Sequence, residues 1–132
     1  LQGLVYPVTD SDTDTECYNA PENQLMLDNK AMVWFWETYT PDAATRSNWD
    51  VSPLQGEVAG VAPAVVLLAE YDVLRAEGEA YAAKLAAAGV PVQTKQFDGQ
   101  MHGFFQFVNI LPGSAEGVKY LAEAVTAHLD GK

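Results

Sequence analysis

The sequence is poor in cysteine and in basic residues. It has one cysteine, and 7 lysine and arginine residues against 18 aspartate and glutamate residues. A single cysteine, Cys17, cannot form an intrachain disulfide, so we expect a structural thiol without a functional role. The formal net charge of −11 repels nucleic-acid phosphates and anionic lipid surfaces, which excludes both as default partners.

Long apolar runs and metal-ligand motifs are also missing. No run approaches the roughly 20 apolar residues that span a bilayer, and no signal-peptide pattern is present, so we expect a cytoplasmic protein without a membrane span. The histidines and the cysteine lack zinc-ligand spacing. The acidic run from Asp10 begins like a calcium loop, but Thr15 and Pro21 stand where that loop needs glycine and glutamate. We therefore expect no metal and no cofactor.

The sequence does contain an alternation of apolar strands and amphipathic helices. The segment 63–69 is apolar on both faces, as is typical of a parallel strand that helices cover. Further strands are expected over 1–8 and over 92–97, the latter near a sheet edge, with helices over about 74–88 and 114–129. This order predicts a parallel sheet in an α/β fold.

Three helices are expected to have distinctive faces. Asp28 can cap a helix that runs to about Tyr39, and the aromatic residues that nearly encircle it indicate burial or an apolar pocket. The stripe of the 74–88 helix that should face the sheet is Leu74, Gly78, Tyr81, Leu85 and Ala88. The 114–129 helix has Ala115, Val118, Leu121, Val125 and Leu129 on one face.

Two ionisable residues follow the two later strands. Catalytic groups in open parallel sheets lie at the carboxyl ends of strands, and right-handed crossovers bring these ends to one edge. Asp72 and His102 are therefore candidate neighbours, and an aspartate beside an imidazole equips a general base that activates a hydroxyl. The residues alone leave a plainer interpretation open, in which Asp72 caps the next helix and His102 is a loop residue. We expect His128, near the end of the last helix, to be structural.

Several segments match known motifs in a known order. These are AEYDVLRAEGE (69–79), FDGQMHGFF (97–105), Tyr6-Pro7-Val8-Thr9-Asp10, Trp34-Phe35-Trp36 with Tyr39, and Ser52-Pro53-Leu54. Together they resemble the hormone-sensitive-lipase-like family of α/β-hydrolase esterases, over nearly the whole chain.

The resemblance implies a role for particular residues. Asp72 would be the acid and His102 the base of a catalytic triad, while Phe104 and Phe105 would line the substrate pocket. Two positions depart from the acid motif, Val73 in place of a common proline and Ala76 in place of a common acid. Matching positions such as Arg75 and Glu77 are expected to form structural ion pairs.

The resemblance also implies the C-terminal part of an α/β-hydrolase fold. The three predicted strands would be the last three of the family's mostly parallel sheet, with flanking helices, and residues 1–132 would form part of one domain. Residues of about 10–50 would contribute to a cap region that includes the aromatic helix. Family members often dimerise, which implies a possible homodimer through about 92–97 and 114–129.

A serine nucleophile is the missing element of this pattern. The family needs a Gly-x-Ser-x-Gly elbow and an oxyanion loop, and the sequence has neither. Ser114 directly follows a glycine at a helix start, where serine is a common N-cap. Since the chain order in this fold is serine, acid, histidine, the serine is expected before residue 1. The chain also begins on a core strand with an uncovered edge, which indicates a missing N-terminal part.

The sequence therefore predicts a serine carboxylesterase of small carboxylic esters, with the serine and the oxyanion hole in the missing part. This chain alone would be inactive. One alternative is a non-catalytic fragment or binding module of the same fold. Another is a phosphoacceptor signalling domain with Asp72 as acceptor, which Lys95 disfavours because it lies inside its strand rather than at the strand end.

Overall fold

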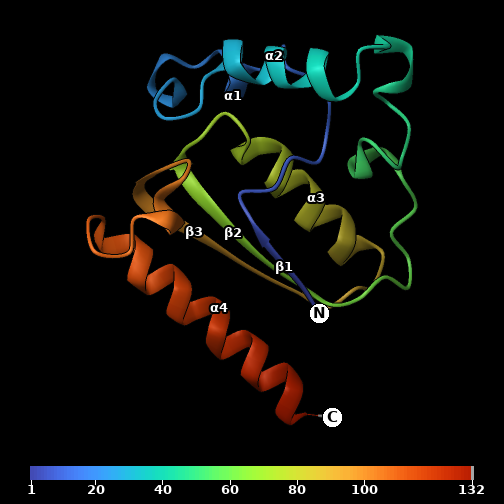
Figure 1. The fold of residues 1–132 in the computed structure, drawn as a ribbon. Helices are drawn as coiled ribbons and strands as arrows, with labels where there is room; N and C mark the ends of the chain where they lie inside the picture. The colour runs from blue at the N-terminus through green and yellow to red at the C-terminus, as the bar shows by residue number, and fades with distance from the viewer. Residues whose placement is uncertain (132) are drawn as a thin grey trace.

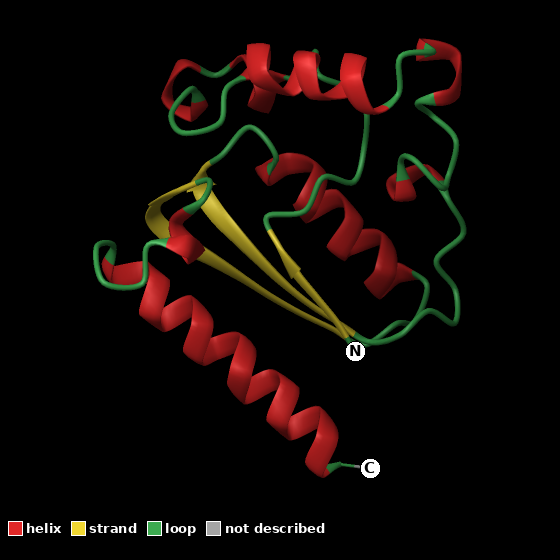
Figure 2. Ribbon diagram, viewed as in Figure 1, coloured by secondary structure: helices red, strands yellow, loops and turns green. Residues whose placement is uncertain are grey.

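The chain folds into a parallel sheet between two helical layers (Figures 1 and 2). The structure is a computed structural model that describes residues 1–131. Strands β1 (Gln2–Val5), β2 (Ala64–Tyr71) and β3 (Val92–Met101) are parallel and stand in the order β1-β2-β3. The predicted parallel sheet of an α/β fold is confirmed.

The central strand β2 is buried on both faces, because alternate side chains point to opposite sides of a sheet. Val66 and Leu68 pack against α3 (Arg75–Ala87). Val65 and Leu67 point the other way, into a core that they share with Phe104 and α4 (Pro112–Asp130). Figure 2 shows α3 and α4 on opposite faces of the sheet.

The buried face of α3 agrees with the prediction except at its end. Leu74, Gly78, Tyr81 and Leu85 are buried, whereas Ala88 is exposed because the helix ends at Ala87. At Gly78 the helix lies so close to β2 that an added Cβ would stand 2.6 Å from Cδ2 of Leu68. A larger residue at that position would have to displace the buried Leu68 side chain, so glycine favours the close contact with the sheet.

The apolar face predicted for the last helix meets the core only in part, through Leu121. The expected stripe is largely exposed, with exposed fractions of 38% for Val118, 38% for Val125 and 61% for Leu129. The buried residues of α4 are Gly113, Ser114 and Gly117. An added Cβ at Gly117 would stand 3.2 Å from the Phe104 ring, so the small residue lets the start of this helix lie close to the core, on which Tyr120 and Leu121 also pack.

Residues between β1 and β2 form a separate layer over the carboxyl ends of the strands (Figure 1). It contains α1 (Glu16–Asn19) and α2 (Asn29–Tyr39), and Asp28 caps α2 as predicted by accepting a hydrogen bond from the Ala31 amide at 2.7 Å. Only one side of α2 is buried, through Met32 and Trp36. A cap role for about 10–50 stays a prediction. None of the helices within residues 1–131 combines the length and apolar character needed to cross a membrane.

Candidate active site

The two predicted site residues lie at the carboxyl ends of neighbouring strands. Asp72 directly follows β2. The third strand is longer than predicted, 92–101 instead of 92–97, so His102 directly follows β3 instead of lying deep in a loop. Its amide donates a hydrogen bond to the carbonyl of Tyr71 at 3.4 Å, which joins the two strand ends.

The extension of β3 depends on an irregular pairing with β2. The register shifts between Ala69 and Tyr71. There the carboxylate of Glu70 accepts a hydrogen bond from the Gly99 amide at 2.6 Å, and Gly99 has a φ of +72°, which suits glycine. This contact fixes the backbone three residues before His102.

The side chains of Asp72 and His102 meet, as the sequence predicted. Oδ2 of Asp72 lies 2.8 Å from Nδ1 of His102, while the Asp72 side chain is fully buried and that of His102 is 21% exposed. An ionised carboxylate only accepts hydrogen bonds, so the contact places the proton of a neutral imidazole on Nδ1. Nε2 is then the nitrogen that can take a proton from another group.

Asp72 also holds the start of α3. Its Oδ1 accepts a hydrogen bond from the Leu74 amide at 2.9 Å. Its carbonyl accepts one from the Arg75 amide at 3.1 Å and one from the buried Cys17 thiol at 3.3 Å. The two interpretations of Asp72 are therefore compatible, because one carboxylate oxygen holds the helix and the other holds the histidine.

Tyr6 lies beside His102. The sequence indicated Tyr6 only as part of a family motif and did not predict this contact. Its ring centroid lies 4.3 Å from that of His102, at an interplanar angle of 52°. Tyr6 has a φ of +37° and is the only non-glycine residue with positive φ within residues 1–131. Such a backbone costs on the order of 1–3 kcal/mol and persists only where the surroundings enforce it.

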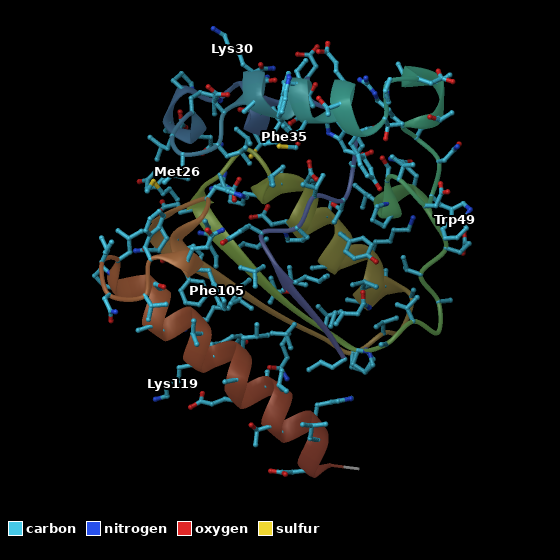
Figure 3. All side chains as sticks on the ribbon, viewed as in Figure 1. Met26, Lys30, Phe35, Trp49, Phe105 and Lys119 are labelled. Carbon is cyan, nitrogen blue, oxygen red and sulfur yellow. The ribbon has the colours of Figure 1, made fainter. Side chains whose placement is uncertain are left out.

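A mostly apolar cavity of about 610 Å³ opens beside His102. Its wall includes Tyr6, Val8, Met32, Phe35, Trp36 and Leu74. In Figure 3, Phe35 lies on the side of α2 that faces the sheet, while Lys30 points away from it. The volume of the cavity, its apolar lining and the few polar groups at one end of it are typical of a site that binds a small organic molecule.

Phe104 and Phe105 lie outside the lining of this cavity. Phe104 is fully buried in the core between the sheet and α4. Phe105 packs beside the same helix, where its ring would lie 3.3 Å from a Cβ added at Gly117 (Figure 3). The geometry thus gives no support to their predicted place in the substrate pocket, which α2 and the segment after β1 form instead.

Glu77 behaves differently from the ion-paired residue that the sequence predicted. Arg75 pairs with Glu79 at 3.8 Å, but the Glu77 carboxylate accepts hydrogen bonds from the amides of Thr9 and Asp10, at 2.6 and 3.2 Å. It also accepts one from the Tyr18 hydroxyl at 2.9 Å. Burial raises its pKa from the ordinary 4.5 to about 7, although these three donors act in the opposite direction.

No group of three or more histidine, cysteine, aspartate or glutamate side chains that could hold a metal ion occurs within residues 1–131. Asp10 and Asp12 instead accept hydrogen bonds from neighbouring backbone amides, as residues of polar loops commonly do. The chemistry that the described residues offer is proton transfer by His102, supported by a buried carboxylate, at one end of an apolar cavity.

Comparison with known proteins gives matches over most of this chain. A family model described as the alpha/beta hydrolase fold matches residues 1–106. An ethyl acetate hydrolase of Pseudomonas putida is 36% identical over 98% of this chain and 41% of its own length. The carboxylic ester hydrolase LipN of Mycobacterium tuberculosis is 37% identical over 98% of this chain and 35% of its own length.

Solved structures give the same result. An alpha/beta hydrolase enzyme from the metagenome of Lake Arreo, Spain, superposes with a TM-score of 0.90 at 35% identity, over 98% of this chain and 41% of that one. A thermostable esterase from Pseudomonas putida has a TM-score of 0.85 at 38% identity, over 91% of this chain and 39% of that one. This chain therefore spans about two fifths of the length of such relatives, and it belongs to the hormone-sensitive-lipase-like family of α/β-hydrolase-fold esterases.

Proposed function

We propose that the full-length protein is a serine carboxylesterase of small carboxylic esters, to which this chain contributes the triad acid Asp72 and the triad base His102. The nucleophilic serine and the oxyanion hole come from another part of the protein. The 2.8 Å contact between Asp72 and His102, beside a cavity of about 610 Å³, is the observation that carries the proposal. The names of the relatives, an ethyl acetate hydrolase and a carboxylic ester hydrolase, support the substrate class.

Acylation is the first half of the proposed reaction. Nε2 of His102 takes the proton of the serine hydroxyl as its oxygen attacks the ester carbonyl carbon, which forms a tetrahedral intermediate. The carbon–oxygen bond to the alcohol then breaks, and the alcohol leaves with the proton from His102. The Asp72 carboxylate stabilises the imidazolium that exists between these two proton transfers.

Deacylation repeats the same proton transfers with water. His102 takes a proton from water, the resulting hydroxide attacks the acyl carbon, and the serine oxygen leaves with that proton. The apolar cavity holds the hydrocarbon part of the ester during both halves. Because the chain contains no Gly-x-Ser-x-Gly segment, residues 1–132 alone should not turn over esters.

Hydrolysis of p-nitrophenyl acetate and butyrate by the full-length protein tests the proposal. His102→Ala should lower kcat by about 10⁴-fold or more, since triad members act as a unit. His128→Ala is the matched control, because His128 lies in the last turn of α4 and should not affect turnover. Turnover that survives His102→Ala would refute the role of His102 as the base. A full-length protein without turnover would favour the non-catalytic binding module instead.

A homodimer through about 92–97 and 114–129 is part of the same proposal. The exposed Val118, Val125 and Leu129 on α4 support it, since a helix rarely presents a row of large apolar residues to water without a partner. Sedimentation of the full-length protein with and without Val125→Glu tests it. A dimer that the glutamate dissociates is the expected result, and a monomer in both cases contradicts the proposal.

A further inference from the structure

Tyr6 combines a strained backbone with a contact to His102. Its φ of +37° is unusual for any residue with a large side chain, and the following Pro7 normally requires an extended residue before it. The amide of Tyr6 donates a hydrogen bond to the Leu67 carbonyl at 2.7 Å, which holds this conformation against the central strand. A strained residue beside a candidate catalytic histidine requires a physical explanation.

The position of the Tyr6 ring supplies that explanation. The ring lies against His102 on one side, at 4.3 Å between centroids. It also meets Phe104, edge to face, at 5.9 Å. Phe104 is fully buried and packs against Phe97 at 5.1 Å, so it forms a rigid support behind Tyr6.

His102 needs such support because Asp72 restrains only one of its atoms. The contact at 2.8 Å holds Nδ1, and a single hydrogen bond to one atom restrains the tilt of the ring plane less than it restrains that atom. The next residue, Gly103, has a φ of +84° and gives the backbone no side-chain restraint of its own. A second contact, on the face of the ring, is required to fix the direction in which Nε2 points.

We propose that Tyr6 is a positioning residue for His102, and that its ring holds the imidazole in the rotamer that binds Asp72 and directs Nε2 toward the substrate. The strained backbone of Tyr6 is what turns its ring onto the histidine. The kinetic consequence of this role rests on the proposed esterase function, whereas the restraint on the imidazole can be measured without any turnover.

The experiment compares Tyr6→Leu, Tyr6→Phe and the unsubstituted full-length protein by NMR of histidine labelled with ¹³C. Leucine keeps apolar bulk without a ring, and phenylalanine keeps the ring without the hydroxyl. Tyr120→Leu is the matched control, because Tyr120 packs on the same core as Phe104 from α4. The His102 signals are identified by their loss in His102→Ala.

The expected NMR result is a single His102 ring signal with a nuclear Overhauser effect to the Tyr6 ring. Tyr6→Leu should shift and broaden this signal as the imidazole samples further rotamers, while Tyr6→Phe and Tyr120→Leu should preserve it. An unchanged signal in Tyr6→Leu would overturn the proposal. If that variant does not fold, as circular dichroism would show, absence of the Overhauser effect in the unsubstituted protein would overturn it equally.

Hydrolysis of p-nitrophenyl acetate gives the kinetic readout. Tyr6→Leu should lower kcat by about 10- to 100-fold, as expected for a misplaced catalytic group, with KM within about threefold and with recovery in Tyr6→Phe. A rise in KM alone would assign Tyr6 to substrate binding and overturn the positioning role. An unsubstituted protein without turnover would refute the proposed function, and the NMR result would still decide whether Tyr6 holds His102.

Discussion

The buried carboxylate of Asp72 divides its two oxygens between His102 and the start of α3, at 2.8 Å from Nδ1 of the histidine and 2.9 Å from the amide of Leu74. This arrangement places the helix and the imidazole in a fixed relation to one carboxyl group. A substitution at this position should therefore affect both the local fold and the candidate catalytic base.

Asp72→Asn should lower kcat of the full-length protein by about 10³- to 10⁴-fold, because the amide presents a donor that favours the wrong imidazole tautomer. The amide oxygen can still accept from Leu74, so the midpoint of thermal unfolding should fall only modestly. Steady-state kinetics with p-nitrophenyl acetate measures the effect. Asp98→Asn, at an exposed carboxylate on β3, is the control that should retain activity, and a loss of less than tenfold in Asp72→Asn would refute the acid role.

Phe35→Ala should lower kcat/KM more for the butyrate ester than for the acetate ester. Phe35 lines the cavity, and each methylene group that it helps to bury contributes about 0.8 kcal/mol at most. A fall of about tenfold for butyrate is expected. The neighbouring Trp34→Ala removes an exposed ring outside the cavity lining, so equal losses in the two variants would contradict the assignment of the cavity to substrate.

Glu77→Gln should change how stability depends on pH. Burial raises the pKa of Glu77 from 4.5 to about 7, so the folded chain retains a proton that the unfolded chain releases between these values. Ionisation of Glu77 therefore lowers the free energy of unfolding as the pH rises through this window, by on the order of 3 kcal/mol in total. The stability that the protonated group contributes is complete below about pH 4.5 and lost above about pH 7.

Urea denaturation of the full-length protein at about pH 5 and about pH 8 measures this difference. Glutamine can still accept from the Thr9 amide, so Glu77→Gln keeps that contact but has no proton to release in this range. The variant should lose less stability between the two conditions than the unsubstituted protein. Glu79→Gln, at the exposed partner of Arg75, is the control. Identical pH dependence in Glu77→Gln and the unsubstituted protein would contradict the assignment.

Sequence patterns were sufficient for the sheet, whereas the pairing of Asp72 with His102 also needed the resemblance to a known family. Apolar periodicity identified β2, and topology placed the two strand ends together. The same periodicity was only partly sufficient for α4, because it identifies Leu121, which packs on the core, but gives no sign that Gly117 lies against Phe104. Hydrophobic periodicity does not detect a place where a small residue such as glycine lets a helix lie close to the core.

Two features of the site depend on tertiary contacts that no sequence pattern contains. The motif around Glu77 suggested an ion pair, but its partners are backbone amides that a distant segment brings to it. The sequence indicated Tyr6 only as part of a family motif. Its positive φ could not be predicted, because the residue before a proline usually has an extended backbone. The extra length of β3 likewise depends on the contact between Glu70 and Gly99.

Labelling with a fluorophosphonate tests the central claim most directly, because this reagent forms a covalent bond with a serine that a histidine base activates. The full-length protein should be labelled at a serine outside residues 1–132, and His102→Ala should slow labelling by about 10³-fold or more. The isolated chain should remain unlabelled. A labelled serine within residues 1–132, or labelling at an unchanged rate in His102→Ala, would contradict the account.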